Sequence, residues 1–167
     1  MTKKKDNIKD YAIAAFRFYA KMGRPDPDKL KERIKEEIYN NLDREYGNSK
    51  GVSNPTETAI IKAEQKIANL EAELLDILAV HRTLERLSAQ GQISAFASVE
   101  IVYFSNPNEK CDRGDIEMAI TKAALELPSS ERQVYRWLAM ARKIFAQERN
   151  LRSNFGTEAI LKYRTTA

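Results

Sequence analysis

Residues that build disulfides and metal sites are scarce in this chain. Among its 167 residues there is one cysteine, Cys111, and one histidine, His81. A single thiol cannot form an internal disulfide, which favours a reducing compartment. One cysteine and one histidine in different predicted elements also cannot supply the ligand set of an ordinary zinc site. We therefore expect neither a metal nor another cofactor.

Helix breakers and long apolar runs are also scarce. The chain has six glycines and five prolines, with 43% hydrophobic and 31% charged residues. This composition is typical of a globular, strongly helical protein. No apolar run approaches the length of a membrane span. The basic start MTKKKDNIKD lacks the apolar core of a signal peptide. We expect an all-α protein of the cytoplasm with no membrane contact.

Two helices are expected in residues 1–46. Apolar periodicity predicts the first over Asn7–Lys21, ended by Gly23 and the Arg-Pro-Asp-Pro turn. The second begins near Asp28 and alternates Lys with Glu, as a solvated helix does. Residues 47–54, rich in Gly, Ser and Asn, are expected to be a linker. The face that the first helix should bury comprises Ile8, Tyr11, Ala12, Ala15, Phe16, Phe18 and Tyr19.

A long central helix is expected over residues 55–92. Its apolar residues keep the a/d spacing of a heptad repeat through residues 60–84. Such a repeat forms either the seam of a homodimer or the spine of a bundle within one chain. Extra apolar residues beside the stripe favour the bundle. His81 lies on the stripe and is expected to be a core or register-fixing residue. The repeat consists of Ile60, Ala63, Ile67, Leu70, Leu74, Ile77, His81 and Leu84.

Residues 93–152 are expected to form a third structural part of the chain, after the N-terminal helices and the long central helix. Its VEIVYF run resembles a strand, but a lone strand among helices would leave its backbone unpaired, so we predict a short buried helix. A polar loop follows, and Asp115 is the expected N-cap of the next helix. The tail, residues 153–167, is expected to add one weak helical turn or to stay mobile.

The segment from Lys122 to Trp137, KAALELPSSERQVYRW, has the pattern of a helix-turn-helix. Pro128 disfavours helical geometry at Leu127 and so ends the first helix. Ser130 is a good N-cap for the second helix, and Gln133 stands at capping-box spacing from it. A small residue in the first helix, Ala124, permits close approach of the second. Ordinary helical hairpins share such patterns, so this remains a hypothesis.

The second helix separates an apolar stripe from a basic face. The stripe contains Val134, Trp137, Leu138, Ala141, Ile144 and Phe145. Trp137 is expected to be a core anchor rather than a stacking platform, because it lies on this stripe. Residues 129–167 hold eight basic and three acidic residues, whereas residues 51–128 hold seven and twelve. Positive charge is therefore concentrated around the second helix, where it would attract phosphates.

Residues 51–150 resemble the small phage and prophage late-gene transcriptional activators of the RinA and ArpU type. The NPTETAI opening of a long helix and the block ALELPSSERQVYRWLAMARKIFA carry the resemblance. The C-terminal part of that family is similar to region 4 of bacterial sigma factors. Pro128 and Ser129 stand where a glycine and an aliphatic residue are usual. The first forty residues match nothing that we can name.

The resemblance implies a site-specific activator that binds double-stranded DNA and contacts RNA polymerase. Its recognition helix would be residues 131–149, in the major groove. Arg132 or Arg136 would contact guanine, while Gln133 would either read adenine or close the capping box. Arg142 and Lys143, further along, suit phosphate or polymerase. The expected DNA-binding residues are Ser129, Ser130, Glu131, Arg132, Gln133, Tyr135, Arg136, Arg142 and Lys143.

Two other classes of protein remain open. A DNA-packaging adaptor of the small-terminase kind also combines a helix-turn-helix with an oligomerising helix, although its motif usually comes first. A helical interaction protein, such as an anti-repressor, would bind no DNA. An enzyme is disfavoured, because the sequence has no Gly-rich phosphate loop, no metal-ligand cluster and no nucleophile paired with a base.

Overall fold

A computed structural model describes residues 6–46 and 55–151 of the chain. Within them the backbone forms α-helices and no strand, as the sequence predicts. The expected linker (47–54) and tail (153–167) lie outside the described residues. None of the described helices is long and apolar enough to cross a bilayer. The helices are α1 (Asn7–Lys21), α2 (Pro27–Tyr46), α3 (Pro55–Asn69), α4 (Glu71–Ala89), α5 (Ile93–Val102), α6 (Arg113–Glu126) and α7 (Glu131–Glu148).

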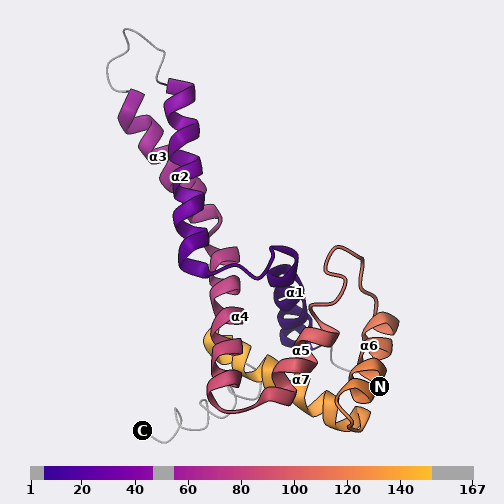
Figure 1. Cartoon of the computed structure of the whole chain (residues 1–167). Helices are drawn as coiled ribbons and strands as arrows, with labels where there is room; N and C mark the ends of the chain where they lie inside the picture. The colour runs from indigo at the N-terminus through magenta and orange to yellow at the C-terminus, as the bar shows by residue number, and fades with distance from the viewer. Residues whose placement is uncertain (1–5, 47–54, 152–167) are drawn as a thin grey trace, which may run out of the picture. The chain divides into compact units, whose positions relative to one another are not determined.

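The chain divides into two compact units that do not follow chain order. The main unit combines residues 1–24 with residues 79–167, and the hairpin unit is residues 25–78. The main unit therefore holds α1, the second part of α4, and α5 to α7 (Figure 1). The hairpin unit holds α2, α3 and the first part of α4.

The core of the main unit is built around α7. This helix packs against α1, α5 and α6. Phe16 of α1 stacks on Tyr103 at 5.4 Å between ring centroids and lies 5.6 Å from Phe145 of α7. All three rings are buried. Such a cluster stabilises the fold by more than its buried apolar area alone would, because each aromatic pair adds about 0.5–1.5 kcal/mol. The aromatic cluster therefore holds α7 against α1 and the end of α5.

The first helix confirms its predicted bounds and most of its predicted core. Asp6 caps α1 by accepting from the backbone N–H of Lys9 at 3.1 Å, and Gly23 ends it with a positive φ of 82°. The prediction was wrong for Tyr11, which is 39% exposed although its ring lies 6.2 Å from that of Phe145. Tyr11 lies at the edge of the aromatic cluster rather than inside it.

The hairpin unit has a much smaller core. In it α2 packs against α3, and the two run side by side in Figure 1. Ala59 and Ala63 of α3 are buried, and Ile38 of α2 packs against them. The carboxylate of Asp26 begins α2 by accepting from the backbone N–H groups of Asp28 and Lys29, at 3.0 and 3.2 Å.

The expected single long helix is two helices. The helix breaks at Leu70, whose backbone N–H donates to Ile67 O at 3.1 Å, an i to i−3 bond rather than the i to i−4 bond of an α-helix. Asn69, a weak helix former, precedes the break. The heptad stripe is also discontinuous, since Ala63, Ile77 and Leu84 are buried while Ile60 and Leu70 are exposed.

His81 lies in a half-buried position on α4. Its Nε2 is 3.0 Å from an oxygen of Glu85, and its Nδ1 is 3.4 Å from the hydroxyl oxygen of Tyr19. Both ring nitrogens therefore have partners from the protein. His81 is thus only partly buried, not a fully enclosed core residue, and its two contacts join it to Glu85 of α4 and Tyr19 of α1.

Candidate nucleic-acid interface

The turn between α6 and α7 forms as the sequence predicts. Glu126 is the last residue of α6 and Leu127 is its C-cap, directly before Pro128. The backbone N–H of Ser129 donates to the carbonyl of Ala124 at 3.0 Å, which satisfies one of the last carbonyls of α6. Ser130 caps α7, because its hydroxyl oxygen accepts from the backbone N–H of Gln133 at 3.1 Å. This is one of the two bonds of a capping box.

The start of α6 differs from the prediction by three residues. The N-cap is Asp112, and Asp115 is the third helical residue. The two form a capping box, in which the Asp115 carboxylate accepts from the backbone N–H of Asp112 at 2.9 Å. Either aspartate is a good N-cap residue, so residue type alone does not show which of the two precedes the first helical turn. Only the backbone conformation distinguishes them.

Small side chains let the two helices approach closely. Ala123 and Ala124 of α6 are buried, and so are Val134 and Leu138 of α7. The hydroxyl of Thr121 also donates to a carboxylate oxygen of Glu131 at 2.9 Å, linking the middle of α6 to the first turn of α7. The angle between the helices is thus fixed by packing on one side and by a hydrogen bond on the other.

A polar clamp holds the loop that leads into α6. Arg17 of α1 donates to four backbone carbonyls, those of Tyr103, Ser105, Asn106 and Glu109, at distances between 2.9 and 3.5 Å. The planar guanidinium suits this role, because it carries five donors in a rigid arrangement. Sequence reasoning missed Arg17. No signal in the sequence pointed to it, because Arg17 lies on the side of α1 opposite the predicted apolar face and its partners are in a distant loop.

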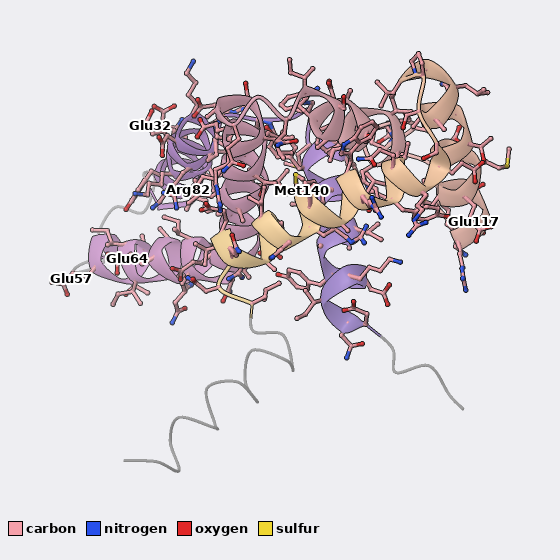
Figure 2. The ribbon with its side chains drawn as sticks, turned by 90° about the horizontal axis from the view of Figure 1, so that it is seen from below. Glu32, Glu57, Glu64, Arg82, Glu117 and Met140 are labelled. Atoms are coloured by element: carbon pink, nitrogen blue, oxygen red, sulfur yellow. The ribbon has the colours of Figure 1, made fainter. Side chains whose placement is uncertain are left out.

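The outer face of α7 carries the exposed basic residues. Arg132, Arg136 and Lys143 are exposed, and their spacing of four and seven residues places them in one stripe along the helix. Val134, Leu138 and Ala141 lie on the opposite, buried face. We call Arg132, Arg136 and Lys143 the basic stripe. Figure 2 shows α7 crossing the front of the main unit, with Met140 labelled near its middle.

These three cations take part in no ion pair within the described part of the chain. Other cations of the main unit do, including Arg24 with Glu100 at 2.9 Å and Arg86 with Glu148 at 3.2 Å. On α6, the pairs Arg113 with Glu117 and Lys122 with Glu126 span one helical turn. Among the described residues, no carboxylate in contact with the stripe offsets its positive charge.

The other expected contact residues around the turn have mixed surroundings. Ser130 and Tyr135 are exposed, and the Ser130 hydroxyl can still donate while its oxygen accepts in the cap. Ser129 is partly buried and its hydroxyl donates to the carbonyl of Ser130 at 3.3 Å. Gln133 is partly buried, and the Glu131 carboxylate is held by Thr121.

Arg142 lies apart from the basic stripe. Its guanidinium donates to the hydroxyl oxygen of Tyr103 at 2.8 Å, and the residue is partly buried. Burial raises the pKa of Tyr103, while the neighbouring Arg142 opposes that rise through its charge and its hydrogen bond. This bond joins the end of α5 to α7, so Arg142 anchors the helix rather than extending its outer face.

Two residues on the outer face were not predicted from the sequence. Ala139 is exposed between Arg136 and Lys143, and Met140 beside it is 36% exposed. A small residue in the middle of the stripe permits close approach of a ligand to the helix backbone. The signal was present in the sequence, because both residues lie off the apolar stripe.

Compared with known protein families, with characterised proteins and with solved structures, the chain shows no match. The geometry of α6 and α7 is therefore the structural basis on which a function can be assigned.

Proposed function

We propose that this protein binds double-stranded DNA through the outer face of α7, with α6 and the turn as its support. The observation that carries the proposal is the basic stripe, three exposed cations that are unpaired within the described residues and lie opposite the buried face of a capped helix. An α-helix with such a face fits the major groove, where arginines contact guanine edges and lysines contact phosphate. The fixed turn before it sets how the helix enters the groove.

Within this proposal the residues divide by position along α7. Arg132 and Arg136, in its first two turns, are the candidates for base contact, with Tyr135 beside them. Lys143 lies two to three turns along and suits a phosphate. The Ser130 hydroxyl, at the positive end of the helix dipole, suits a second phosphate. Arg142, which is bonded to Tyr103, has no place in this contact set.

The biological role that we propose is activation of transcription of phage or prophage late genes. The order of capped turn and amphipathic helix with Tyr-Arg in its second turn supports it through the resemblance to the RinA and ArpU type. Contact with RNA polymerase is part of the same proposal. Exposed apolar residues on α6, Met118 and Leu125, would be available for such a protein contact.

Binding can be tested with the full chain and a pool of random-sequence duplex DNA, by anisotropy at several salt concentrations. Replacing Arg132, Arg136 and Lys143 by alanine should weaken binding. The slope of the logarithm of the binding constant against the logarithm of the salt concentration should also become less negative, by about 0.9 for each phosphate that the protein no longer neutralises. The matched control replaces Lys9, Lys29 and Arg33, exposed cations outside α6 and α7, by alanine and changes net charge equally.

The two triple variants separate site binding from general attraction. If both lose affinity equally, the protein responds only to net charge and the proposed site is wrong. If neither changes affinity, the chain binds DNA through another surface and the proposed site is wrong. If the wild-type chain does not bind the pool, DNA binding itself is refuted. A duplex enriched from the pool by repeated rounds of binding is then placed upstream of a reporter, and a transcription assay tests activation.

A further inference from the structure

The hairpin unit carries an open groove that the proposed DNA contact does not use. It has a volume of about 460 Å³ and lies between α2 on one side and α3 with the start of α4 on the other. Its apolar lining comprises Tyr39, Ile67, Leu74, Leu75 and Leu78. Tyr39 and Leu75 are 42% and 40% exposed, so a substantial part of this apolar surface faces water.

The two walls of the groove carry opposite charge. The α2 wall contributes Lys31 and Lys35, with Asp28 in the first turn of the same helix, so this wall carries a net positive charge. The opposite wall contributes Glu64 from α3 and Glu71 from α4. All five residues are exposed, and Figure 2 labels Glu64 along α3, with Glu57 at the start of that helix. The groove is thus an apolar floor between a basic wall and an acidic wall.

The hairpin unit buries little apolar surface of its own. Among its described side chains the buried hydrophobic residues are Leu30, Ala59, Ala63 and Ile77, two of which are alanines. Ile60, Ile61 and Leu70 are exposed in addition to the groove residues. A helical unit of this size usually needs further apolar burial to be stable, and association with another chain is a common source.

We propose that the face of the hairpin unit that carries this groove packs against the same face of a second copy of the chain, in a two-fold symmetric dimer. In a two-fold interface a residue that contacts a partner residue is itself contacted in the same way. The basic wall of one copy can therefore face the acidic wall of the other, twice over. The exposed apolar residues between the walls, Tyr39 and Leu75, then lose their exposure to bulk water.

This interface differs from the homodimer seam that the heptad repeat suggested over residues 60–84. Val80 and Leu84 are buried within the main unit, so a continuous seam of that length is not accessible. The groove shares Ile67 and Leu74 with the repeat, but its other wall is formed by residues of α2, which lie outside the repeat. The inference is independent of DNA binding, and either proposal can fail without the other.

The test measures association of the full-length chain by sedimentation equilibrium over a wide concentration range. We expect a reversible dimer. The variant Lys31→Glu with Lys35→Glu should associate roughly tenfold more weakly or worse, because like charges then face each other across the interface. Glu64→Lys with Glu71→Lys should have the same effect. The matched controls, Lys29→Glu with Arg33→Glu and Glu57→Lys with Glu73→Lys, make the same changes of net charge at exposed residues outside the groove lining and should leave association unchanged.

Mixing the two charge variants tests whether the two walls contact each other between chains. In the mixed dimer each inverted wall meets an inverted partner wall, so association should return toward the wild-type value. Within each single chain the walls remain mismatched, so a purely internal role of these residues predicts no rescue. Leu75→Glu, on the apolar floor, should abolish association in the wild-type background and in the mixture. Circular dichroism checks that every variant keeps its helix content.

Several results would overturn the inference. A chain that stays monomeric at all concentrations leaves the groove to a different partner. A dimer that survives every groove variant places its interface elsewhere. Failure of the mixture to recover association, or assembly into a larger ring, excludes the two-fold arrangement.

Discussion

Arg132 occupies the position on α7 at which a change of residue should alter specificity as well as affinity. It is exposed in the first turn, next to the Ser130 cap, and it is in no ion pair within the described chain. A bidentate contact from arginine to guanine discriminates against other bases by about 1–3 kcal/mol. Lys143, two to three turns further on, should contribute through its charge alone.

We therefore expect Arg132→Ala and Lys143→Ala to weaken binding in different ways. With a selected duplex, Arg132→Ala should lose affinity and relax the preference at one base pair. Lys143→Ala should weaken binding to all sequences alike and reduce the slope of log affinity against log salt concentration by about 1. Competition binding against duplexes with single base changes measures both effects. If Arg132→Ala lowers affinity equally for every sequence, its contact is to the backbone rather than to a base.

Burial of the Tyr103 phenol gives the main unit a stability that depends on pH at high pH, and Arg142 only partly opposes this effect. Burial raises the pKa of Tyr103 above its ordinary value of 10.0. Above the pH at which the unfolded phenol ionises, the unfolded state binds fewer protons than the folded state. The free energy of unfolding should therefore fall as the pH rises from about 10 toward the pKa of the folded phenol, by up to about 1.4 kcal/mol per pH unit.

Tyr103→Phe should reveal this dependence by removing it. At pH 8 the variant should be less stable by about 1 kcal/mol, because the Arg142 guanidinium loses its partner. As the pH rises past 10, the difference from the wild-type chain should shrink. Urea unfolding of both proteins at several pH values measures it, and titration of the lysines cancels in the comparison. A difference that stays constant across this range would show that Tyr103 does not titrate differently on folding.

At the scale of elements, the cap of α7 joins stability to the proposed contact. Ser130→Ala removes the acceptor for the Gln133 N–H and should cost about 0.5–2 kcal/mol. Ser130→Asp keeps an acceptor there, so stability should be retained. Its negative charge, however, would face phosphate, so DNA affinity should fall while the melting temperature does not. Equal behaviour of the two variants in DNA binding would mean that this end of the helix lies away from the backbone of DNA.

The sequence was most informative where local chemistry determines the structure. The bounds of α1, the helical state of α5 and the Ser130 cap were all predicted, because periodicity and capping residues act within one or two turns. The break at Leu70 was not, since no proline or glycine lies near it. Nor was the role of Arg142, because its partner Tyr103 is 39 positions away in the chain. Residue type alone does not reveal such a partner.

At the scale of the whole molecule, the same limit applies to the division into units. Segmentation along the chain groups α1 with α2, yet α1 packs on α7 and belongs with the C-terminal helices. That grouping rests on contacts such as Phe16 with Phe145, between distant parts of the sequence. Two units with such unequal cores should also differ in how readily they open.

Hydrogen exchange should detect this difference and connect it with association. Amides of α5 and α7 are backed by the large core of the main unit and should exchange slowly. Amides of α2 and α3, with little buried apolar surface behind them, should exchange faster at low protein concentration, because local opening costs less there. If the groove closes in a dimer, raising the concentration should slow exchange in α2, α3 and the start of α4 while leaving α7 unchanged, since binding stabilises only the bound part. Mass spectrometry of peptides from samples labelled at two concentrations makes the comparison, with Leu75→Glu as the non-associating control. Uniform slowing across both units would mean that the whole chain opens as one. If exchange in α2, α3 and the start of α4 did not slow, the hairpin unit would not be part of a dimer interface.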